Sequence, residues 1–251
     1  MATQESQVEI PLNHPRRFSL LMRARLTEGV RQGITSLDGL LAHGRGEAFD
    51  YLMGEKTRDF AARAIEAAAA LLLVARRPVI SVNGNTAALV PRELGALSEI
   101  LDAPLEVNLF HAGGEREIRI HDHLLAHGGR RVLLPEREFV LPYLQSNRRF
   151  VNGRGIYQAD VIFVPLEDGD RCEALIRSGR KVIAIDLNPL SRTAQKATIT
   201  IVDNIVRSLP LLADRVKELA SGPPSTLHNL LENYDNGMAL REAEKILRGG
   251  D

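Results

Sequence analysis

The chain has 251 residues, and its 32 Lys and Arg are balanced by 32 Asp and Glu, so its formal net charge is zero. Without a global basic field, the composition argues against a nucleic acid or an anionic membrane surface as partner. The longest apolar stretch, residues 67–75, is far shorter than the ~20 residues of a membrane-spanning helix, and residues 1–8 lack the order of a signal peptide. The single cysteine, Cys172, excludes an intrachain disulfide and a cysteine-built zinc site. We therefore expect a cytoplasmic protein without a membrane or nucleic-acid partner.

Predicted helices and strands alternate along the chain. The region before Thr57 is expected to form helices that pack against a sheet. Thr57 is the predicted N-cap of an Ala- and Leu-rich helix that ends at residue 75, and a strand at residues 79–82 follows directly after Pro78. Further strands are expected at residues 105–110 and 132–134 and near Val161, Val182 and Ile199, with helices at 91–101, 115–127, 226–232 and 238–247.

This alternation is typical of a parallel sheet that is covered by helices. We predict a Rossmann-like α/β fold, with helices on both faces of a parallel sheet and with N-terminal and C-terminal helical segments, as a single domain over residues 1–251. Polar residues follow four of the strands, at 83–85, 165–171, 186–193 and 203–204. Because ligands bind outside the carboxyl ends of parallel strands, these four segments are predicted to converge on one polar rim.

The usual nucleotide-binding signatures are missing from the chain. Neither a G-x-x-x-x-G-K-[ST] loop nor a G-x-G-x-x-G fingerprint is present, which disfavours a standard P-loop enzyme and a dehydrogenase. Helix N-termini and arginine forks can hold phosphates instead, and residues 188–193 and 204–207 offer both. Ordinary turn and cap chemistry is the alternative for each of these loops taken alone.

Two glycines bracket an arginine in the segment 42–50, which reads A-H-G-R-G-E-A-F-D. We interpret this segment as a turn that presents Arg45 to a phosphate, because glycine permits a close backbone approach and arginine binds phosphate through two parallel hydrogen bonds. His43 beside it can donate to a carboxylate or phosphate oxygen. A helix C-cap with a solvated arginine and a structural histidine is the alternative.

Two further strand ends could bind substrates. Asn83 and Asn85 both donate and accept hydrogen bonds, which suits a small hydroxylated carboxylate, although Asn-Gly is also a common turn. Glu167, Asp168 and Asp170 could hold Mg²⁺, bind an ammonium group or assist its deprotonation, or could form a solvated acidic turn.

Three histidines, His121, His123 and His127, invite interpretation as a metal site. Only His123 and His127 share a helical face, and no third ligand is evident, whereas zinc sites normally need three or four ligands. We therefore expect no fixed metal site on the protein.

Several long strings occur in a fixed order along the chain. They are S-L-L-M-R at 19–23, A-H-G-R-G-E-A-F-D-Y-L at 42–52, V-I-S-V-N-G-N at 79–85, P-L-E-D-G-D-R at 165–171, D-L-N-P-L-S-R-T-A at 186–194 and I-T-I-V-D-N-I at 199–205. Together they closely resemble the archaeal 4-phosphopantoate:β-alanine ligase family, also called phosphopantothenate synthetase. The resemblance spans nearly the whole chain except residues 111–154, to which we carry no function.

The resemblance implies an enzyme of coenzyme A biosynthesis. Such an enzyme condenses (R)-4-phosphopantoate with β-alanine, uses ATP with Mg²⁺, releases 4′-phosphopantothenate, AMP and pyrophosphate, and works as a homodimer. The ATP contacts of the family fall here on Arg23, Arg45, Asp186, Leu187, Asn188, Arg192, Thr193, Asn204 and Ile205.

The substrate roles are assigned from residue chemistry within this resemblance. Arg45 and Arg192 are predicted to offset the repulsion between two anionic substrates, and Asp168 is the third predicted catalytic residue. We expect 4-phosphopantoate at Asn83, Gly84 and Asn85 with His43 near the reacting carboxylate, and β-alanine at Asp168 and Asp170. A non-catalytic nucleotide-binding or metabolite-sensing α/β protein is the alternative function.

Overall fold

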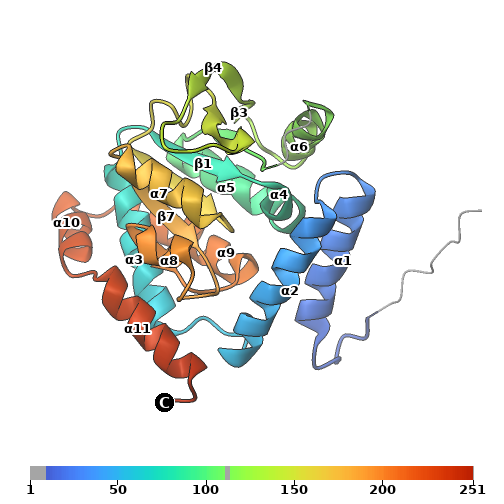
Figure 1. Cartoon of the computed structure of the whole chain (residues 1–251). Helices are drawn as coiled ribbons and strands as arrows, with labels where there is room; N and C mark the ends of the chain where they lie inside the picture. Colours follow the sequence, from blue (N-terminus) through green and yellow to red (C-terminus); the bar gives the residue numbers. More distant parts are fainter. Residues whose placement is uncertain (1–9, 111–113, 251) are drawn as a thin grey trace, which may run out of the picture.

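The computed structural model describes residues 10–110 and 114–250 (Figure 1). Six parallel strands form the central sheet in the order β3-β2-β1-β6-β7-β8, so the direction in which strands are added reverses between β1 and β6. This is the strand order of doubly wound dinucleotide-binding folds, and it confirms the predicted Rossmann-like class. The strands are β1 (Pro78–Val82), β2 (Leu105–Val107), β3 (Val132–Leu133), β6 (Val161–Pro165), β7 (Lys181–Ile185) and β8 (Ile199–Ile201).

Helices connect the strands and cover both faces of the sheet. They are α1 (Arg17–Arg31), α2 (Leu37–Leu52), α3 (Asp59–Val74), α4 (Gly84–Leu89), α5 (Pro91–Leu101), α6 (Gly114–Ala126), α7 (Gly169–Arg177), α8 (Arg192–Lys196), α9 (Ile205–Ala220), α10 (Pro224–Glu232) and α11 (Asn236–Leu247).

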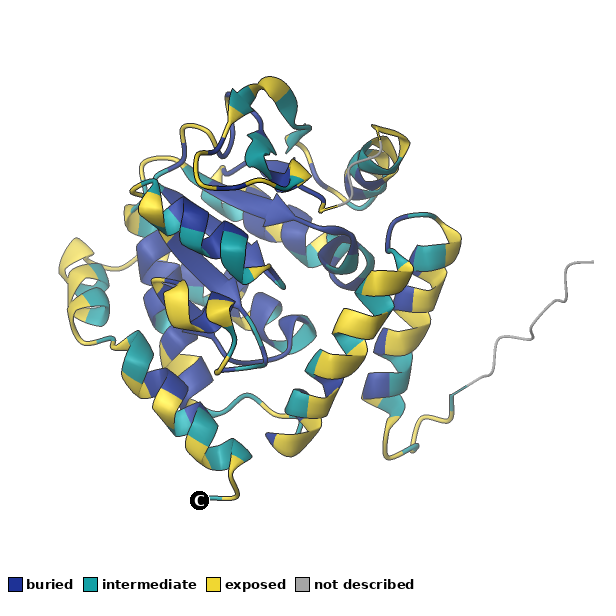
Figure 2. Ribbon diagram, in the orientation of Figure 1, coloured by how far each residue is buried: buried dark blue, intermediate teal, exposed yellow. Residues whose placement is uncertain are grey.

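The apolar runs of the strands are buried on both faces, as a parallel sheet requires. Ile80, Phe163 and Ile183 share one core with side chains from α3, α5 and α9. Val79 and Ile162 point to the other face and share a core with α7 and with residues 141–159. Figure 2 shows the strands as the buried centre of the molecule, between these two layers.

The terminal helices occupy different places around the sheet. α1 packs on α4, and α1 and α2 lie together beyond the end of the sheet rather than on one of its faces (Figure 1). α3 is apolar on almost all sides because α9 and β8 contact it as well as α10 and α11. The predicted C-terminal helices are confirmed as α10 and α11.

The local structure differs from the prediction at three points. Thr57 is not an N-cap: its hydroxyl donates to Asp203 Oδ2 at 2.6 Å, and Arg58 occupies the cap position. Asn83 begins the short helix α4 instead of a loop, because its side chain and that of Thr86 form a capping box. An unpredicted antiparallel pair, β4 (Glu136–Val140) and β5 (Phe150–Val151), lies outside the main sheet.

Candidate active site

Two adjoining cavities lie at the carboxyl end of the sheet, beside the reversal between β1 and β6. The first has a volume of about 390 Å³ and the second about 380 Å³. Ala42, Asn85, Leu166 and Asp168 line both, so the two cavities meet at these residues. Such a reversal point is where ligands bind in open α/β sheets.

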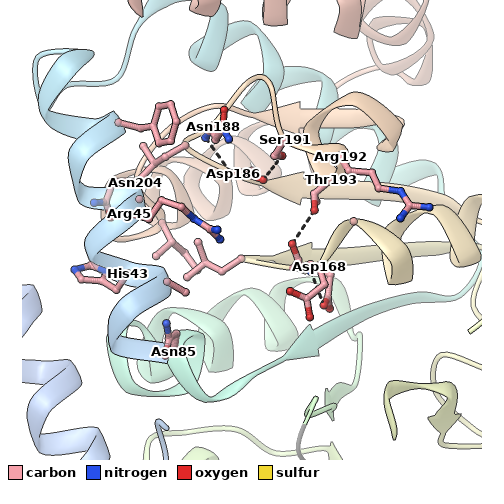
Figure 3. A pocket seen from close by; sticks show the side chains of 18 of the residues that line it. His43, Arg45, Asn85, Asp168, Asp186, Asn188, Ser191, Arg192, Thr193 and Asn204 are labelled. Atoms are coloured by element: carbon pink, nitrogen blue, oxygen red, sulfur yellow. Dashed lines mark hydrogen bonds between the residues drawn. The ribbon is translucent and has the colours of Figure 1, made fainter. Parts of the chain in front are cut away.

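The first cavity lies between α2 and the loops that follow β6, β7 and β8 (Figure 3). The predicted polar strand ends meet there because their strands are neighbours in the sheet. Its further lining residues are His43, Arg45, Gly46, Phe49, Leu89, Glu167, Gly169, Asp186, Leu187, Asn188, Ser191, Arg192, Thr193, Asn204 and Ile205.

The segment 42–50 is the middle of a continuous helix, so the predicted glycine turn around Arg45 is wrong. Ser36 caps this helix, α2, by accepting a hydrogen bond from the Gly39 N–H. Helical spacing places Arg45, Gly46 and Phe49 together on the wall of the first cavity. Gly46 leaves room there because it has no side chain, and a Cβ at this position would lie 3.6 Å from Leu187 Cδ1.

The loop after β7 is held in shape by Asp186. The Asp186 carboxylate accepts hydrogen bonds from the Asn188 N–H, at 2.9 Å, and from the Ser191 hydroxyl. Ser191 in turn caps α8 by accepting from the Ala194 N–H. Burial raises the pKa of Asp186, whereas the Ser191 hydrogen bond and the charge of Arg45 act in the opposite direction. Asp186 therefore organises the loop that carries Leu187 and Asn188 into the cavity.

Arg45 and His43 contribute different chemistry from α2. The Arg45 guanidinium extends toward the space between α2 and the strand-end loops (Figure 3). Burial lowers the pKa of His43, although the charge of Glu47 opposes the change. The imidazole is therefore neutral at pH 7, and its Nε2 is buried without a hydrogen-bond partner among the described residues.

The other two predicted ATP arginines are engaged with acidic side chains. Arg23 forms a two-bond ion pair with Glu47, with both distances 2.8 Å, and does not line either cavity. Arg192 lines the first cavity, but its guanidinium pairs with Glu173 and points away from Arg45 (Figure 3). Both arginines would have to leave these partners to contact a ligand in the first cavity, and their predicted role stays a prediction.

The corner between β8 and α9 is fixed by buried ion pairs. The Asn204 side chain caps α9 through the Val206 N–H and donates to Asp50 Oδ2 at 2.8 Å. Arg207 pairs with both Asp50 and Asp203, whose carboxylates are 2% and 1% exposed. This network joins α2 to α9 and holds Asn204 and Ile205 against the first cavity.

A second buried network lies under the loop after β6. Thr193 donates its hydroxyl to the Glu167 carbonyl oxygen at 2.7 Å. The Glu167 carboxylate pairs with Arg171, which is fully buried, and Arg171 also donates to Ser81 Oγ at 3.0 Å. Leu166, which lines both cavities, has a φ of 56°, a conformation that costs free energy for a residue other than glycine. Strain of this kind concentrates at functional sites.

The predicted 4-phosphopantoate residues line the second cavity. Asn83 uses both of its amide donors on the carbonyl oxygens of Pro165 and Leu166, and Asn85 donates to the Gly39 carbonyl oxygen at 2.8 Å. These side chains therefore hold α4 against its neighbours, and their substrate contacts stay predictions.

The two predicted β-alanine residues are separated by the structure. Asp168 lies where the cavities meet. Asp170 lines neither cavity, and its Oδ1 accepts the Arg171 N–H at 2.8 Å in the first turn of α7. The geometry therefore favours Asp168 over Asp170 as the residue that contacts a ligand.

Sequence reasoning assigned no role to several residues on the cavity walls, among them Phe49, Leu166, Arg116 and Arg148. Phe49 follows Arg45 by four positions, and a helical interpretation of 42–50 would have found it. Leu166 carries no polar signal, and its backbone conformation is not visible in the sequence. Arg116 and Arg148 line the second cavity from the segment to which no motif could be assigned.

Two kinds of feature are absent from the described parts of the chain. No group of three or more His, Cys, Asp or Glu side chains there is arranged to hold a metal ion. No helix within residues 10–110 and 114–250 is long and apolar enough to cross a membrane.

Comparison with known proteins identifies relatives over most of the chain. The model of a family described as phosphopantothenate/pantothenate synthetase matches residues 60–249. The 4-phosphopantoate–β-alanine ligase of Thermococcus onnurineus is 49% identical over 238 residues, which cover 94% of this chain and 90% of the relative. The ligase of the same name from Methanosarcina mazei is 50% identical over 235 residues, which cover 94% and 92%. The chain belongs to the phosphopantothenate/pantothenate synthetase family.

Proposed function

We propose that this protein condenses 4-phosphopantoate with β-alanine, with cleavage of ATP to AMP and pyrophosphate, to give 4′-phosphopantothenate for coenzyme A synthesis. The meeting of two cavities at Asp168 carries the proposal. A condensation that ATP drives needs a nucleotide and an acid side by side, with the amine entering between them. The sensor alternative needs only one ligand pocket.

We assign ATP to the first cavity. Leu187, Phe49 and Ile205 give it apolar surface against which a base can pack. Arg45 and the N-terminal residues of α7 and α9 lie on the same walls, and helix N-termini and guanidinium groups stabilise phosphate charge. Mg²⁺ would enter with the nucleotide and offset the charge of its phosphates.

The residues between the cavities would bring the acid and the amine together. A carboxylate is a poor electrophile because its charge and resonance resist attack, so activation by ATP must precede amide formation. Arg45 would offset the repulsion between the acid and the phosphates. Asp168 would attract the ammonium group of β-alanine. The neutral His43 imidazole, with an unpartnered buried Nε2, would donate a hydrogen bond from Nε2–H to the reacting carboxylate.

A second copy of the chain is the proposed partner, and a cytoplasmic location goes with this function. α2 exposes an apolar stripe of Leu37, Leu41 and Leu52, which are 70%, 77% and 59% exposed and do not line the first cavity. Large exposed apolar side chains on one helix are typical of a protein interface. Leu41→Glu should shift the mass measured by light scattering from dimer to monomer. A wild-type protein that is monomeric at micromolar concentration would contradict the homodimer.

The experiment that tests the activity is detection of nucleotide products. We expect AMP and 4′-phosphopantothenate to form together when ATP, Mg²⁺, β-alanine and 4-phosphopantoate are all present. Replacing the acid by pantoate, or leaving out the acid or the amine, should give little AMP. Folded protein that binds ATP but yields no AMP under any of these conditions would favour the non-catalytic alternative.

A further inference from the structure

We propose that Arg116 and Arg148 form the phosphate subsite of the second cavity and select the phosphorylated acid over pantoate. The inference rests on the proposed function, because it names the part of the substrate that the second cavity recognises. Both residues lie in the segment 111–154, to which the sequence motifs assigned nothing.

Arg116 and Arg148 are the two cationic side chains among the described residues that line the second cavity. They reach it from different directions, Arg116 from α6 and Arg148 from the turn (Asn147–Arg149) that precedes β5. Guanidinium groups match phosphate oxygens through planar pairs of hydrogen bonds. Two such groups on one cavity wall are therefore suited to a phosphate dianion.

Arg116 is held in place by the backbone. Its Nε donates to the Ile34 carbonyl oxygen at 3.0 Å, which leaves the terminal nitrogens for other partners. The guanidinium lies directly over Gly84, where an added Cβ would come within 2.6 Å of Arg116 Nη2 and 2.5 Å of the Ile34 oxygen. The glycine of the Asn-Gly-Asn motif thus allows this arginine to approach the start of α4.

Arg148 belongs to a buried cluster of arginine and acidic side chains. Its side chain is 8% exposed, and its Nε has no hydrogen-bond partner in the described part of the chain. Glu167 pairs with both Arg148 and Arg171, so two buried guanidiniums share one carboxylate. Asp168 lies 3.6 Å from Arg148 but is half exposed. A phosphate in the cavity would accept hydrogen bonds from Arg148, since buried donors need partners.

The rest of the second cavity fits the remainder of the acid. Leu109, Phe110 and Leu166 provide apolar surface for the dimethyl carbon of 4-phosphopantoate. Ala42 and Asn85, which line both cavities, mark the side that opens to the nucleotide, where the carboxylate must react.

Calorimetric titration of the full chain with 4-phosphopantoate and with pantoate, without ATP, tests the subsite. Arg116→Gln should weaken the binding of 4-phosphopantoate by about 10- to 100-fold, because it removes a hydrogen-bonding charge, and should change pantoate binding less than about twofold. Arg148→Lys, which keeps the charge beside Glu167 but loses the planar fork, should cause a smaller loss with the same selectivity for the phosphorylated acid. Arg119→Gln is the matched control, since Arg119 lies on α6 and lines neither cavity.

The possible outcomes separate the subsite from the reaction. If the wild type forms AMP and both arginine variants keep its preference for the phosphorylated acid, the subsite is wrong and the proposed function stands. If the wild type forms no AMP but Arg116→Gln abolishes its preference, the subsite stands and the proposed function fails. Equal weakening of both acids by Arg116→Gln would show a general loss of the cavity and would overturn the phosphate assignment.

Discussion

The two cavities occupy the same end of the same sheet, yet they are built in different ways. The first is lined by short contiguous stretches of chain, above all 186–193 and 204–205, whose residues follow directly from the ends of β7 and β8. The second combines the starts of α2 and α4 with Arg116 and Arg148, which are far apart in sequence. A site made of contiguous strand ends is visible as a motif, whereas a site made of distant side chains is not.

The largest expected effect comes from removing the Arg45 guanidinium from the first cavity. Arg45→Ala should slow AMP formation about 10²- to 10³-fold with all substrates saturating, because a donor aimed at developing charge is lost. The affinity for 4-phosphopantoate in the absence of ATP should stay unchanged, which separates the two cavities. Arg130→Ala is the control, since Arg130 is 78% exposed and lines neither of them. An unchanged rate of AMP formation would remove Arg45 from the mechanism.

The buried ion pairs of Arg207 with Asp50 and Asp203, which lie beside the first cavity, should be needed for a stable fold. Arg207→Met leaves the carboxylates of Asp50 and Asp203 buried without their cation, which should lower the free energy of unfolding by about 3 kcal/mol. Urea denaturation measures this loss. Arg215→Met removes a partly exposed arginine of the same helix, which pairs with Glu66 and Glu218, and should cost only about 0.5 kcal/mol. Similar losses in both variants would contradict the special role of the Arg207 network.

Glu106 is buried, and its titration should make the stability of the fold depend on pH. Glu106 on β2 accepts hydrogen bonds from the N–H groups of Asn152 and Ile156, and burial raises its pKa to about 7. The pKa of this carboxyl in the unfolded chain is 4.5. Between pH 4.5 and about pH 7 the folded state therefore binds more protons than the unfolded state, so the contribution of Glu106 to stability is lost as the pH rises.

Unfolding free energies measured from pH 4 to 8 test this assignment. Wild type should lose up to about 3 kcal/mol relative to Glu106→Gln across that range. Glu115→Gln, at an exposed position on α6, should show no such pH-dependent difference from wild type. A wild-type curve parallel to that of Glu106→Gln would mean that the carboxyl titrates as it does in the unfolded chain.

The smallest expected effect compares two glycines of α2. Gly44→Ala and Gly46→Ala should each raise the stability by about 1 kcal/mol, because alanine is the better helix former. A Cβ at Gly44 meets nothing within 4 Å, whereas one at Gly46 adds to the wall of the first cavity. Only Gly46→Ala should therefore raise the KM for ATP, by several-fold. A similar KM in both variants would place the nucleotide away from this part of α2.

Prediction from the sequence succeeded where local pattern and topology agree. The apolar runs at β1, β6, β7 and β8 indicated the parallel sheet, and the strand order then brought their polar ends to one edge. The prediction failed for the segment 42–50. Two glycines suggested a turn there, but α2 packs over the first cavity, and this packing stabilises a helix. Helix propensity is a weak guide wherever tertiary contacts decide.

The sequence by itself determined the fold class, the family and the residues of the loops after β7 and β8, because these depend on periodicity and on contiguous motifs. Only the tertiary structure decided that Arg23 and Arg192 are paired with Glu47 and Glu173, and that Asp168 rather than Asp170 lies between the cavities. It alone also brought Arg116 and Arg148 together. Electrostatic partners and cavity walls depend on distances in space, and residues that are far apart in the chain carry no local signal of such distances.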